Sequence, residues 1–413
     1  MPDPVNQMMS YFQERLPGNL DLLGKMVSIN SFTANAAGVN ELGELTAQVF
    51  KPYGFRARFV QSANSRHGKH LFLTRACKDA NALTIVMVSH LDTVFPAQEE
   101  IDNQFFWHAE GDRLYGPGSV DIKGGSVMIL MVLDALREFF PKLYENTTWL
   151  LAFDATEEVL SDDFARLLLE SLHANTLACL VFEGGTPANG RFPVVTARKG
   201  RASYRIRVEG RSAHAGNRHH QGANAIVQIA HTIQHIAALT DYDQNITFNV
   251  GTIQGGSVVN RVPHYAEAEV EMRAFAPHIF DQGVSDMLAL NGACQVSSQD
   301  GYPCNVRITL QDQTSPWPRN SRTDWLFDLW RETGEALGMV VIAEERGGLS
   351  DGNMIWDTVA TLDGLGPVGN NAHCSERSQD GSKDQEYVQR SSFVPKALLN
   401  TLAIARLLEA PQR

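Results

Sequence analysis

The fold is decided by the stretch LTIVMVSH, residues 83–90, a continuous apolar run that ends in polar residues. Such a run is typical of a strand buried on both faces of a parallel sheet. Two later segments repeat the pattern, TTWLLAFDATEE (147–158) and LACLVFEGG (177–185). A helical pattern covers residues 124–139, between the first two strands. The order strand, helix, strand predicts an α/β sheet.

The pattern changes near Arg198 to strands of alternating polarity separated by helices. It predicts an α+β block with elements at 203–210, 222–239, 246–256, 264–275, 278–290 and 303–311. The α/β pattern returns after the stretch SPWPRN, residues 315–320. A chain of 413 residues also exceeds what one core usually organises. We therefore expect a larger domain of residues 1–197 and 313–413, with a smaller domain of residues 198–312 inserted into it.

Composition limits the classes of partner that the protein can bind and indicates its cellular compartment. The formal net charge of −12 argues against nucleic acid or an anionic membrane as partner. No signal peptide is visible, and no run approaches the roughly 18 apolar residues of a membrane span. The five cysteines are scattered and lack CxxC spacing, which favours reduced thiols in a cytoplasmic protein. A single Cys294–Cys304 bridge is the alternative.

Potential metal ligands follow each of the three buried strands. His90 and Asp92 follow the first, Glu157 and Glu158 the second, and Glu183 the third. Each group alone also fits a surface pair or a solvated turn. Because ligands bind at the carboxyl ends of strands in open α/β sheets, three such ends in one domain predict a site.

A glycine-rich loop, YGPGSVDIKGG (115–125), places Asp121 just before the helix at 124–139. The loop has neither the Walker pattern nor GxGxxG. Three interpretations of this loop remain open at this point: a phosphate loop, a plain turn, or a loop that presses a carboxylate against cations.

Taken together, six segments resemble the zinc-dependent exopeptidase and deacylase family, which includes glutamate carboxypeptidase, acetylornithine deacetylase, succinyl-diaminopimelate desuccinylase and aminoacylase. In chain order they are SHLDTV, GPGSVDIKGG, ATEEV, VFEGG, RSAHAG and AHCSERS. The GPG form, with Pro117, is closest to the glutamate carboxypeptidase branch. The resemblance implies a catalytic domain with helices on both faces of a mixed sheet. It also implies that the inserted domain serves as a lid and forms a homodimer.

The resemblance further implies two zinc ions per subunit, with cobalt or manganese as alternatives. Asp121 would bridge both ions, His90 and Glu183 would complete one site, and Glu158 and His373 the other. Histidine nitrogen and carboxylate oxygen are ordinary zinc ligands. Two zinc ions carry +4 and the three carboxylates −3, which favours one bridging hydroxide as nucleophile. The peptide bond after Asp121 would be cis.

Other residues acquire roles from the same resemblance. Glu157 would be the general base, and Asp92 would orient His90. His214, from the small domain of a partner subunit, would polarise the scissile carbonyl. Asn260 and Arg273 would hold a substrate carboxylate, for which the planar fork of arginine is suited.

The predicted reaction is cleavage of an amide next to a free carboxylate of a small peptide, as in a carboxypeptidase. An N-acyl-amino-acid deacylase on the same site is the alternative. The sequence departs from the family at Val159, Leu160 and Ser161, beside the site, so the substrate stays open. A non-catalytic binding protein on the same fold would require a damaged ligand set, whereas every position here is filled.

A serine hydrolase is the distant alternative. Gly348-Leu-Ser350-Asp-Gly352 matches G-x-S-x-G, and Asp363 and His373 follow in the order of α/β-hydrolase triads. This interpretation leaves His90, Asp121 and both glutamate positions unexplained. The family resemblance instead assigns Ser350 and Asp351 to the substrate pocket.

Overall fold

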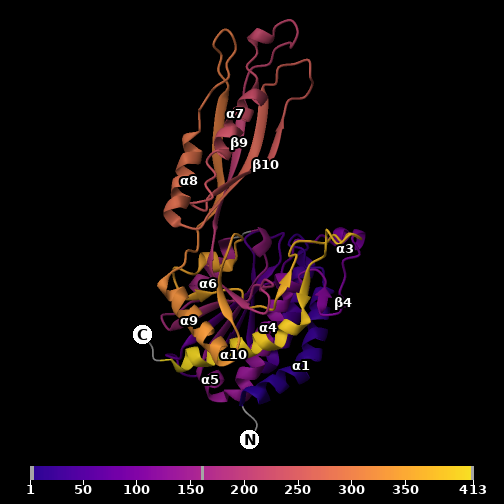
Figure 1. Cartoon of the computed structure of the whole chain (residues 1–413), viewed down its shortest axis with the longest axis vertical. Helices are drawn as coiled ribbons and strands as arrows, with labels where there is room; N and C mark the ends of the chain where they lie inside the picture. Colours follow the sequence, from indigo (N-terminus) through magenta and orange to yellow (C-terminus); the bar gives the residue numbers. More distant parts are fainter. Residues whose placement is uncertain (1–3, 160–161, 411–413) are drawn as a thin grey trace. The chain divides into compact units, whose positions relative to one another are not determined.

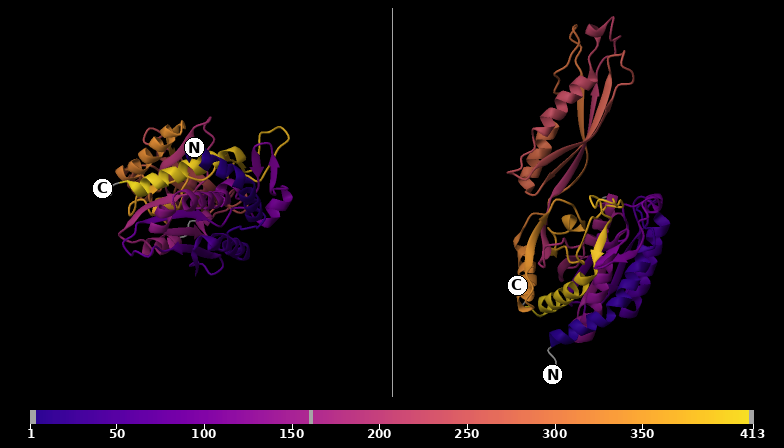
Figure 2. Two further views of the ribbon diagram at one scale, coloured as in Figure 1. Left: turned by 90° about the horizontal axis from the view of Figure 1, so that it is seen from below. Right: turned by 45° about the vertical axis from the view of Figure 1, so that its right-hand side comes forward.

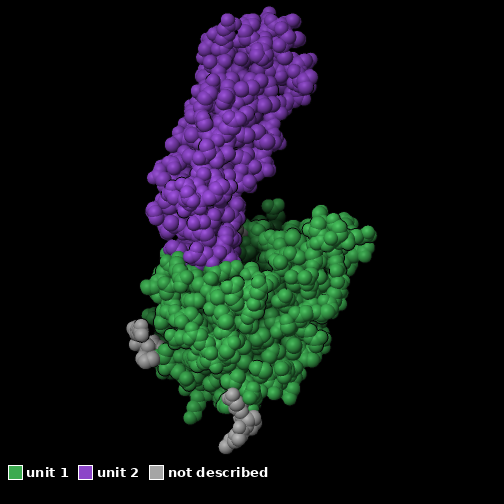
Figure 3. Space-filling model, viewed as in Figure 1, with its two compact units in different colours: residues 1–196, 319–344, 350–413 green, residues 197–318, 345–349 purple. Residues whose placement is uncertain are grey.

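The structure, a computed structural model, describes residues 4–159 and 162–410. It divides into two compact units (Figure 3). Unit 1 comprises residues 1–196, 319–344 and 350–413, and unit 2 comprises residues 197–318 and 345–349. The sequence-based boundaries at 198 and 312 stay a prediction. Unit 2 also includes residues 345–349, whereas the sequence-based division places them in the larger domain.

A mixed sheet with the strand order β1-β2-β6-β3-β7-β14 forms the centre of unit 1. Figure 1 labels several of the unit 1 helices, among them α1, α4 and α10. Strands β6, β3, β7 and β14 run parallel, while β1 and β2 are antiparallel to their neighbours. The strands are β1 (Arg56–Gln61), β2 (Lys69–Arg75), β3 (Thr84–His90), β6 (Thr148–Asp154), β7 (Thr176–Val181) and β14 (Thr361–Leu362). The predicted α/β class with a mixed sheet is therefore confirmed.

Helices cover both faces of this sheet because the central strands are apolar on both sides. Ile85 and Met87 of β3 belong to the core on one face of the sheet. The helices that contribute to this core are α1 (Pro4–Val27), α2 (Ala36–Phe50), α4 (Gly124–Phe139), α9 (Ser321–Ala336) and α10 (Phe393–Glu409). Val86 and Val88 point to the other face, where Phe164 of α6 (Asp162–Glu170) packs. Figure 2 shows the layers of unit 1 from two further sides.

The remaining elements of unit 1 are short or peripheral, and two of them, β8 and β13, end in residues of unit 2. A small sheet has the order β15-β16-β5-β4, and β13 pairs with β8. Their bounds are α3 (Ala97–Asp102), β4 (His108–Glu110), β5 (Arg113–Tyr115), α5 (Pro141–Asn146), β8 (Phe192–Arg198), β13 (Val341–Arg346), β15 (Gly369–Asn370) and β16 (Tyr387–Gln389).

Unit 2 is an antiparallel sheet with the order β10-β11-β9-β12 and two helices on one face. Its elements are β9 (Gly200–Glu209), α7 (Ala225–Ala237), β10 (Thr247–Gly255), β11 (Tyr265–Ala274), α8 (Pro277–Ala289) and β12 (Asn305–Thr314). Ile206 and Val208 are buried under the helices, whereas Arg205 pairs with Glu269 at 2.9 Å on exposed side chains. This alternation is what the sequence predicts for a half-buried sheet.

Two further expectations concern the thiols and the membrane. All five cysteines are free in the structure, Cys294 and Cys304 included. Among the residues described, no helix combines the length and the apolar character needed to cross a bilayer.

Candidate metal centre

The three predicted strand ends lie side by side at one edge of the unit 1 sheet. Strands β6, β3 and β7 are parallel neighbours, and His90 at the end of β3 pairs with Asp154 at the end of β6. Glu157 and Glu158 lie in the turn that follows β6, and Glu183 follows β7. Neighbouring parallel strands thus bring side chains that are far apart in sequence to one place.

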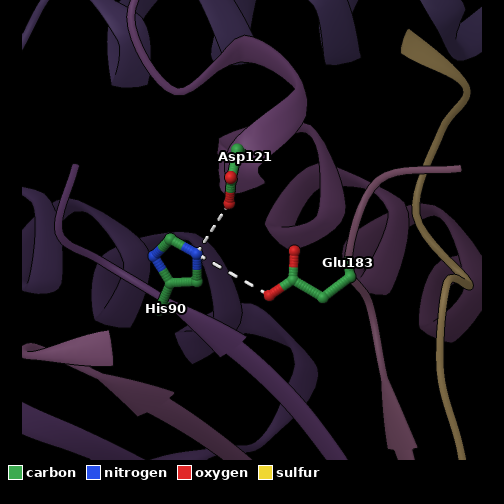
Figure 4. A group of neighbouring side chains, drawn as sticks. All are labelled: His90, Asp121 and Glu183. Atoms are coloured by element: carbon green, nitrogen blue, oxygen red, sulfur yellow. Dashed lines mark hydrogen bonds and ion pairs between the residues drawn. The ribbon is translucent and has the colours of Figure 1, made fainter. Parts of the chain in front are cut away.

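A first group of potential ligands joins His90, Asp121 and Glu183 (Figure 4). The His90 Nε2 atom lies 3.0 Å from Asp121 Oδ1 and 3.8 Å from Glu183 Oε1. The ligand atoms of the three residues all lie within 4.8 Å of one another. His90 is only 1% exposed, so its imidazole is held in place by the surrounding core.

A second group joins Asp121, Glu158 and His373. The His373 Nε2 atom lies 3.1 Å from Glu158 Oε2 and 3.3 Å from Asp121 Oδ2. Asp121 therefore offers Oδ1 to the first group and Oδ2 to the second. The His373 side chain is 54% exposed, which leaves this side of the centre open to solvent.

Glycines allow the Asp121 loop to come close to β7. A Cβ on Gly125 would lie 2.0 Å from the carbonyl oxygen of Phe182, so a larger residue cannot fit there. Gly118 has φ of +73°, a conformation that favours glycine. The peptide bond between Asp121 and Ile122 is cis, as the resemblance implies.

Glu386 supports the same loop and was missed in the sequence. Its Oε1 atom accepts hydrogen bonds from Val120 N at 2.9 Å and from Asp121 N at 3.2 Å. Burial, with the nearby charge of Asp121, raises the pKa of Glu386 to about 8. The residue lies thirteen positions after His373 in the stretch QEYV, which carries no recognisable spacing signal.

Asp92 acts more broadly than the resemblance implies. His90 Nδ1 lies 3.0 Å from the main-chain oxygen of Asp92 and 3.5 Å from its carboxylate, so the main chain provides the closer partner. The carboxylate instead accepts from Thr33 Oγ1 at 2.7 Å, from Glu157 N at 3.2 Å and from Glu158 N at 3.3 Å. Asp92 thus links the end of β3 to the glutamate turn.

The protein groups alone leave the centre short of positive charge. Burial raises the pKa of Glu157 well above its ordinary value, and it raises that of Glu158 to about 7, where the charge of Asp121 adds to the effect. Hydrogen bonds that His373 donates to Asp121 and Glu158 raise its pKa to about 11. Burial would raise the pKa of Asp121, but hydrogen bonds from His373 and His90 outweigh it and lower the pKa. Such a donor set fits divalent cations, whose binding displaces protons from ligands.

The serine hydrolase alternative finds no support in the geometry. Ser350 Oγ donates to Asp363 Oδ2 at 2.8 Å and accepts from Gly352 N at 3.2 Å, so it caps a turn. A triad requires a histidine at the serine hydroxyl. His373 lies instead beside Asp121 and Glu158.

Ser350 and Asp351 are also the predicted substrate residues of unit 1. They are only 1% and 3% exposed. Their assignment to a substrate pocket stays a prediction.

The other predicted substrate residues belong to unit 2. A main-chain hydrogen bond from Ala215 N to Asn260 O, 3.0 Å long, holds His214 and Asn260 in neighbouring segments. His214 Nδ1 accepts from Gly216 N at 3.1 Å, which leaves Nε2 as its donor. Arg273 donates to Gly347 O at 2.7 Å and to Glu271 at 2.6 Å. The roles of these residues stay predictions.

Comparisons with known proteins agree with this description. Residues 196–289 match the peptidase dimerisation domain of the M20 type. The chain is 27% identical over 271 residues to carboxypeptidase G2 of Pseudomonas sp. (strain RS-16), an alignment that covers 66% of this chain and 63% of the relative. It is 27% identical over 275 residues to acetylornithine deacetylase of Edwardsiella ictaluri, covering 63% and 68%. The match thus spans just under two thirds of carboxypeptidase G2.

Solved structures share the fold along nearly the whole chain. Aminopeptidase PepT from Bacillus cereus has a TM-score of 0.74 at 20% identity, covering 96% of this chain and 99% of that one. An M20 family metallo-carboxypeptidase from Sulfolobus solfataricus has a TM-score of 0.67 at 15% identity, covering 94% and 99%. The family resemblance is therefore confirmed: the chain is related to the M20 metallopeptidases and deacetylases. Among named relatives, it resembles both carboxypeptidase G2 and acetylornithine deacetylase.

Proposed function

We propose that the protein is a hydrolase that cleaves an amide bond next to a free carboxylate with the help of two zinc ions. The observation that carries the proposal is the position of Asp121, whose two carboxylate oxygens belong to two different ligand groups. His90 and Glu183 would complete one cation site, and Glu158 and His373 the other. Cobalt and manganese are alternatives that the ligand types allow.

Two zinc ions would supply the positive charge that brings the pKa of a water molecule near neutrality and polarises a carbonyl. Glu157 is the base of the proposal: it is a neighbour of ligand Glu158 but belongs to neither ligand group. Its backbone N–H is held by Asp92 at 3.2 Å, which fixes the start of the glutamate turn. The Glu157 carboxylate would accept the proton of the attacking water and deliver it to the leaving amine.

The substrate carboxylate would be held by Asn260 and Arg273, and the developing oxyanion by His214. Support for this assignment is the exposed side chain of His214, which keeps Nε2 as a donor and lies in the segment beside Asn260, together with the guanidinium of Arg273. The name of one relative favours a carboxypeptidase, and the name of another favours an N-acyl-amino-acid deacylase. Both reactions cleave an amide near a free carboxylate. We favour the carboxypeptidase, with the deacylase as second candidate.

We also infer a homodimer formed through unit 2, which would let His214 act in the site of a partner subunit. The matched dimerisation domain supports this inference. Unit 2 also exposes apolar side chains, with Val227 44% and Ile253 52% exposed. Sedimentation of the purified chain, across a range of protein concentrations, measures this directly.

The test of the proposed function is hydrolysis of a panel of N-acyl amino acids and C-terminal dipeptides with zinc restored. We expect release of the carboxylate-bearing amino acid from at least one class. A chelator should abolish the activity and added zinc should restore it, while serine-directed reagents leave it intact. Activity that survives chelation and is lost to a serine reagent would refute the proposal. The relative rates on dipeptides and acyl amino acids decide between peptidase and deacylase.

Arg273→Ala tests the carboxylate assignment. We expect KM to rise by about 10- to 100-fold, because a charge-assisted bidentate contact to the substrate is lost, an effect on the order of 1.5–3 kcal/mol. Turnover at saturating substrate should change much less. Arg205→Ala, on the same unit but in an exposed pair with Glu269, is the control and should leave KM unchanged. Equal KM values for wild type and Arg273→Ala would refute the assignment.

A further inference from the structure

A buried histidine outside the ligand groups lies between two carboxylates. His70, in β2, has a side chain with 0% exposure. Its Nδ1 atom lies 3.0 Å from Asp154 Oδ1, and its Nε2 atom lies 3.1 Å from Asp163 Oδ2. Both partners are also buried, with side chains 1% and 8% exposed. Such a triad in the interior of a protein calls for a physical explanation.

The two carboxylates lie at either end of the segment that contains the proposed base. Asp154 is the last residue of β6, and Asp163 is the second residue of α6. Between them in the chain lie Glu157 and Glu158. One imidazole ring therefore connects both ends of the glutamate segment to β2, the neighbour of β6 in the sheet.

Further hydrogen bonds to the two carboxylates fix the backbone at each end of the glutamate segment. Asp154 Oδ1 also accepts from Thr156 N at 2.8 Å and from Thr156 Oγ1 at 3.0 Å, which shapes the turn just before Glu157. Asp163 Oδ2 also accepts from the backbone N–H of Ala63. The triad thus controls the direction in which the chain leaves β6 and the point at which it enters α6.

Two carboxylates and a backbone amide surround the His70 ring. Burial lowers the pKa of His70, but the hydrogen bonds and charges of Asp154 and Asp163 outweigh it, and the pKa is raised. Nδ1 also accepts from the backbone N–H of Ala155 at 3.2 Å. The ring therefore contacts the main chain just after β6 as well as both carboxylates.

Stability alone is a weak reason for such a triad. Taking charged groups out of water often costs more free energy than their mutual attraction returns. Apolar residues of similar volume frequently give equal stability. A buried network does, however, hold its members in one geometry. We propose that His70 is a positioning residue for Glu157 and Glu158, acting through Asp154 and Asp163. The inference rests on the proposed function, since it assumes that these glutamates act as base and ligand.

Loss of the triad should affect the two cations differently because of the position of Glu158. Glu158 belongs to the second ligand group and not to the first. His90 ends β3 and Glu183 follows β7. Asp154 meets the end of β3 through its main chain, which accepts from Leu91 N at 2.6 Å, and this pairing does not depend on the His70 or Asp163 side chains. Loss of the triad should therefore weaken the binding of one of the two cations, while the other stays bound. It should also lower kcat more than it raises KM, because Glu157 moves and the substrate carboxylate contacts stay.

The experiment compares His70→Ala and Asp163→Ala with Asp163→Asn, using zinc titration of the chelator-treated full chain and steady-state kinetics. In His70→Ala and Asp163→Ala, one zinc equivalent should bind about 10- to 100-fold more weakly, as is usual when a residue behind a ligand is lost. Their kcat should fall on the order of 100-fold, as expected when a base is displaced by about 1 Å. Asp163→Asn keeps an oxygen that accepts from His70 and from Ala63, so it should retain most of both properties.

Tyr144→Phe is the matched control. Tyr144 is 1% exposed, and its hydroxyl donates to Tyr53 O at 2.9 Å, beside the opposite end of β6. This variant loses a buried hydrogen bond without touching the triad, so its zinc affinities and kcat should match the wild type. Its thermal unfolding gives the loss of stability against which the triad variants are compared.

The inference is overturned if folded His70→Ala or Asp163→Ala binds both zinc equivalents and turns over like the wild type. It is also overturned if Asp163→Asn loses as much as Asp163→Ala, since the hydrogen-bond geometry would then not be what matters. Should His70→Ala fail to fold, the two Asp163 variants decide. A wild-type chain that binds no zinc and hydrolyses nothing would instead refute the proposed function, which keeps the two failures apart.

Discussion

Asp121→Ala should reduce the zinc content of the chain from two ions to at most one and lower hydrolysis to the background rate. The reason is geometric: Asp121 is the residue shared by both ligand groups, with Oδ1 3.0 Å from His90 Nε2 and Oδ2 3.3 Å from His373 Nε2. No other residue of these groups affects both cations directly. The measurement is metal content after dialysis against zinc, together with turnover of the best substrate of the panel.

Asp102→Ala is the control for Asp121→Ala, because it removes one exposed carboxylate of α3 outside both ligand groups. It should bind two zinc ions and turn over at the wild-type rate. Full zinc content in Asp121→Ala would contradict the assignment of Asp121 as the shared ligand.

Glu157→Gln should lower kcat by roughly two to four orders of magnitude, the usual contribution of a general base. Zinc content should stay at the wild-type level, because Glu157 is absent from both ligand groups. The amide keeps the size of the side chain but is a poor proton acceptor at neutral pH. Steady-state kinetics and metal analysis on the same preparation check both halves of this expectation.

Glu158→Gln is a matched comparison one residue away. Glu158 Oε2 lies 3.1 Å from His373 Nε2 within the second ligand group, so this variant should lose zinc affinity first and activity in consequence. High zinc should partly rescue Glu158→Gln but not Glu157→Gln. If zinc rescues Glu157→Gln instead, the roles of base and ligand are exchanged between the two glutamates.

The central strands were predictable because burial on both faces leaves a clear mark in the sequence. The run that ends at His90 became β3, and the helix predicted for 124–139 became α4 with the same limits. The parallel neighbours β6, β3 and β7 bring their carboxyl ends to one edge of the sheet, which is where ligands bind in open α/β sheets. Spacing alone decided none of the individual ligands. The ordered match of six segments to a known family did so.

Other features depend on neighbours that sequence patterns do not reveal. β1 (Arg56–Gln61) is mostly exposed at the sheet edge, so it lacks an apolar run. Glu386 and His70 act through contacts with residues more than eighty positions away. For Asp92, the closest partner of His90 Nδ1 is the main-chain oxygen, and only coordinates distinguish this from the carboxylate. Segment 345–349 joins unit 2 by contacts that its sequence does not show.

Anomalous diffraction at the zinc absorption edge, from crystals of the zinc-loaded chain, tests the central claim most directly. The account predicts two peaks in unit 1. One should lie among His90, Asp121 and Glu183, and the other among Asp121, Glu158 and His373. A single peak, or peaks at which Asp121 is not a ligand, would contradict it.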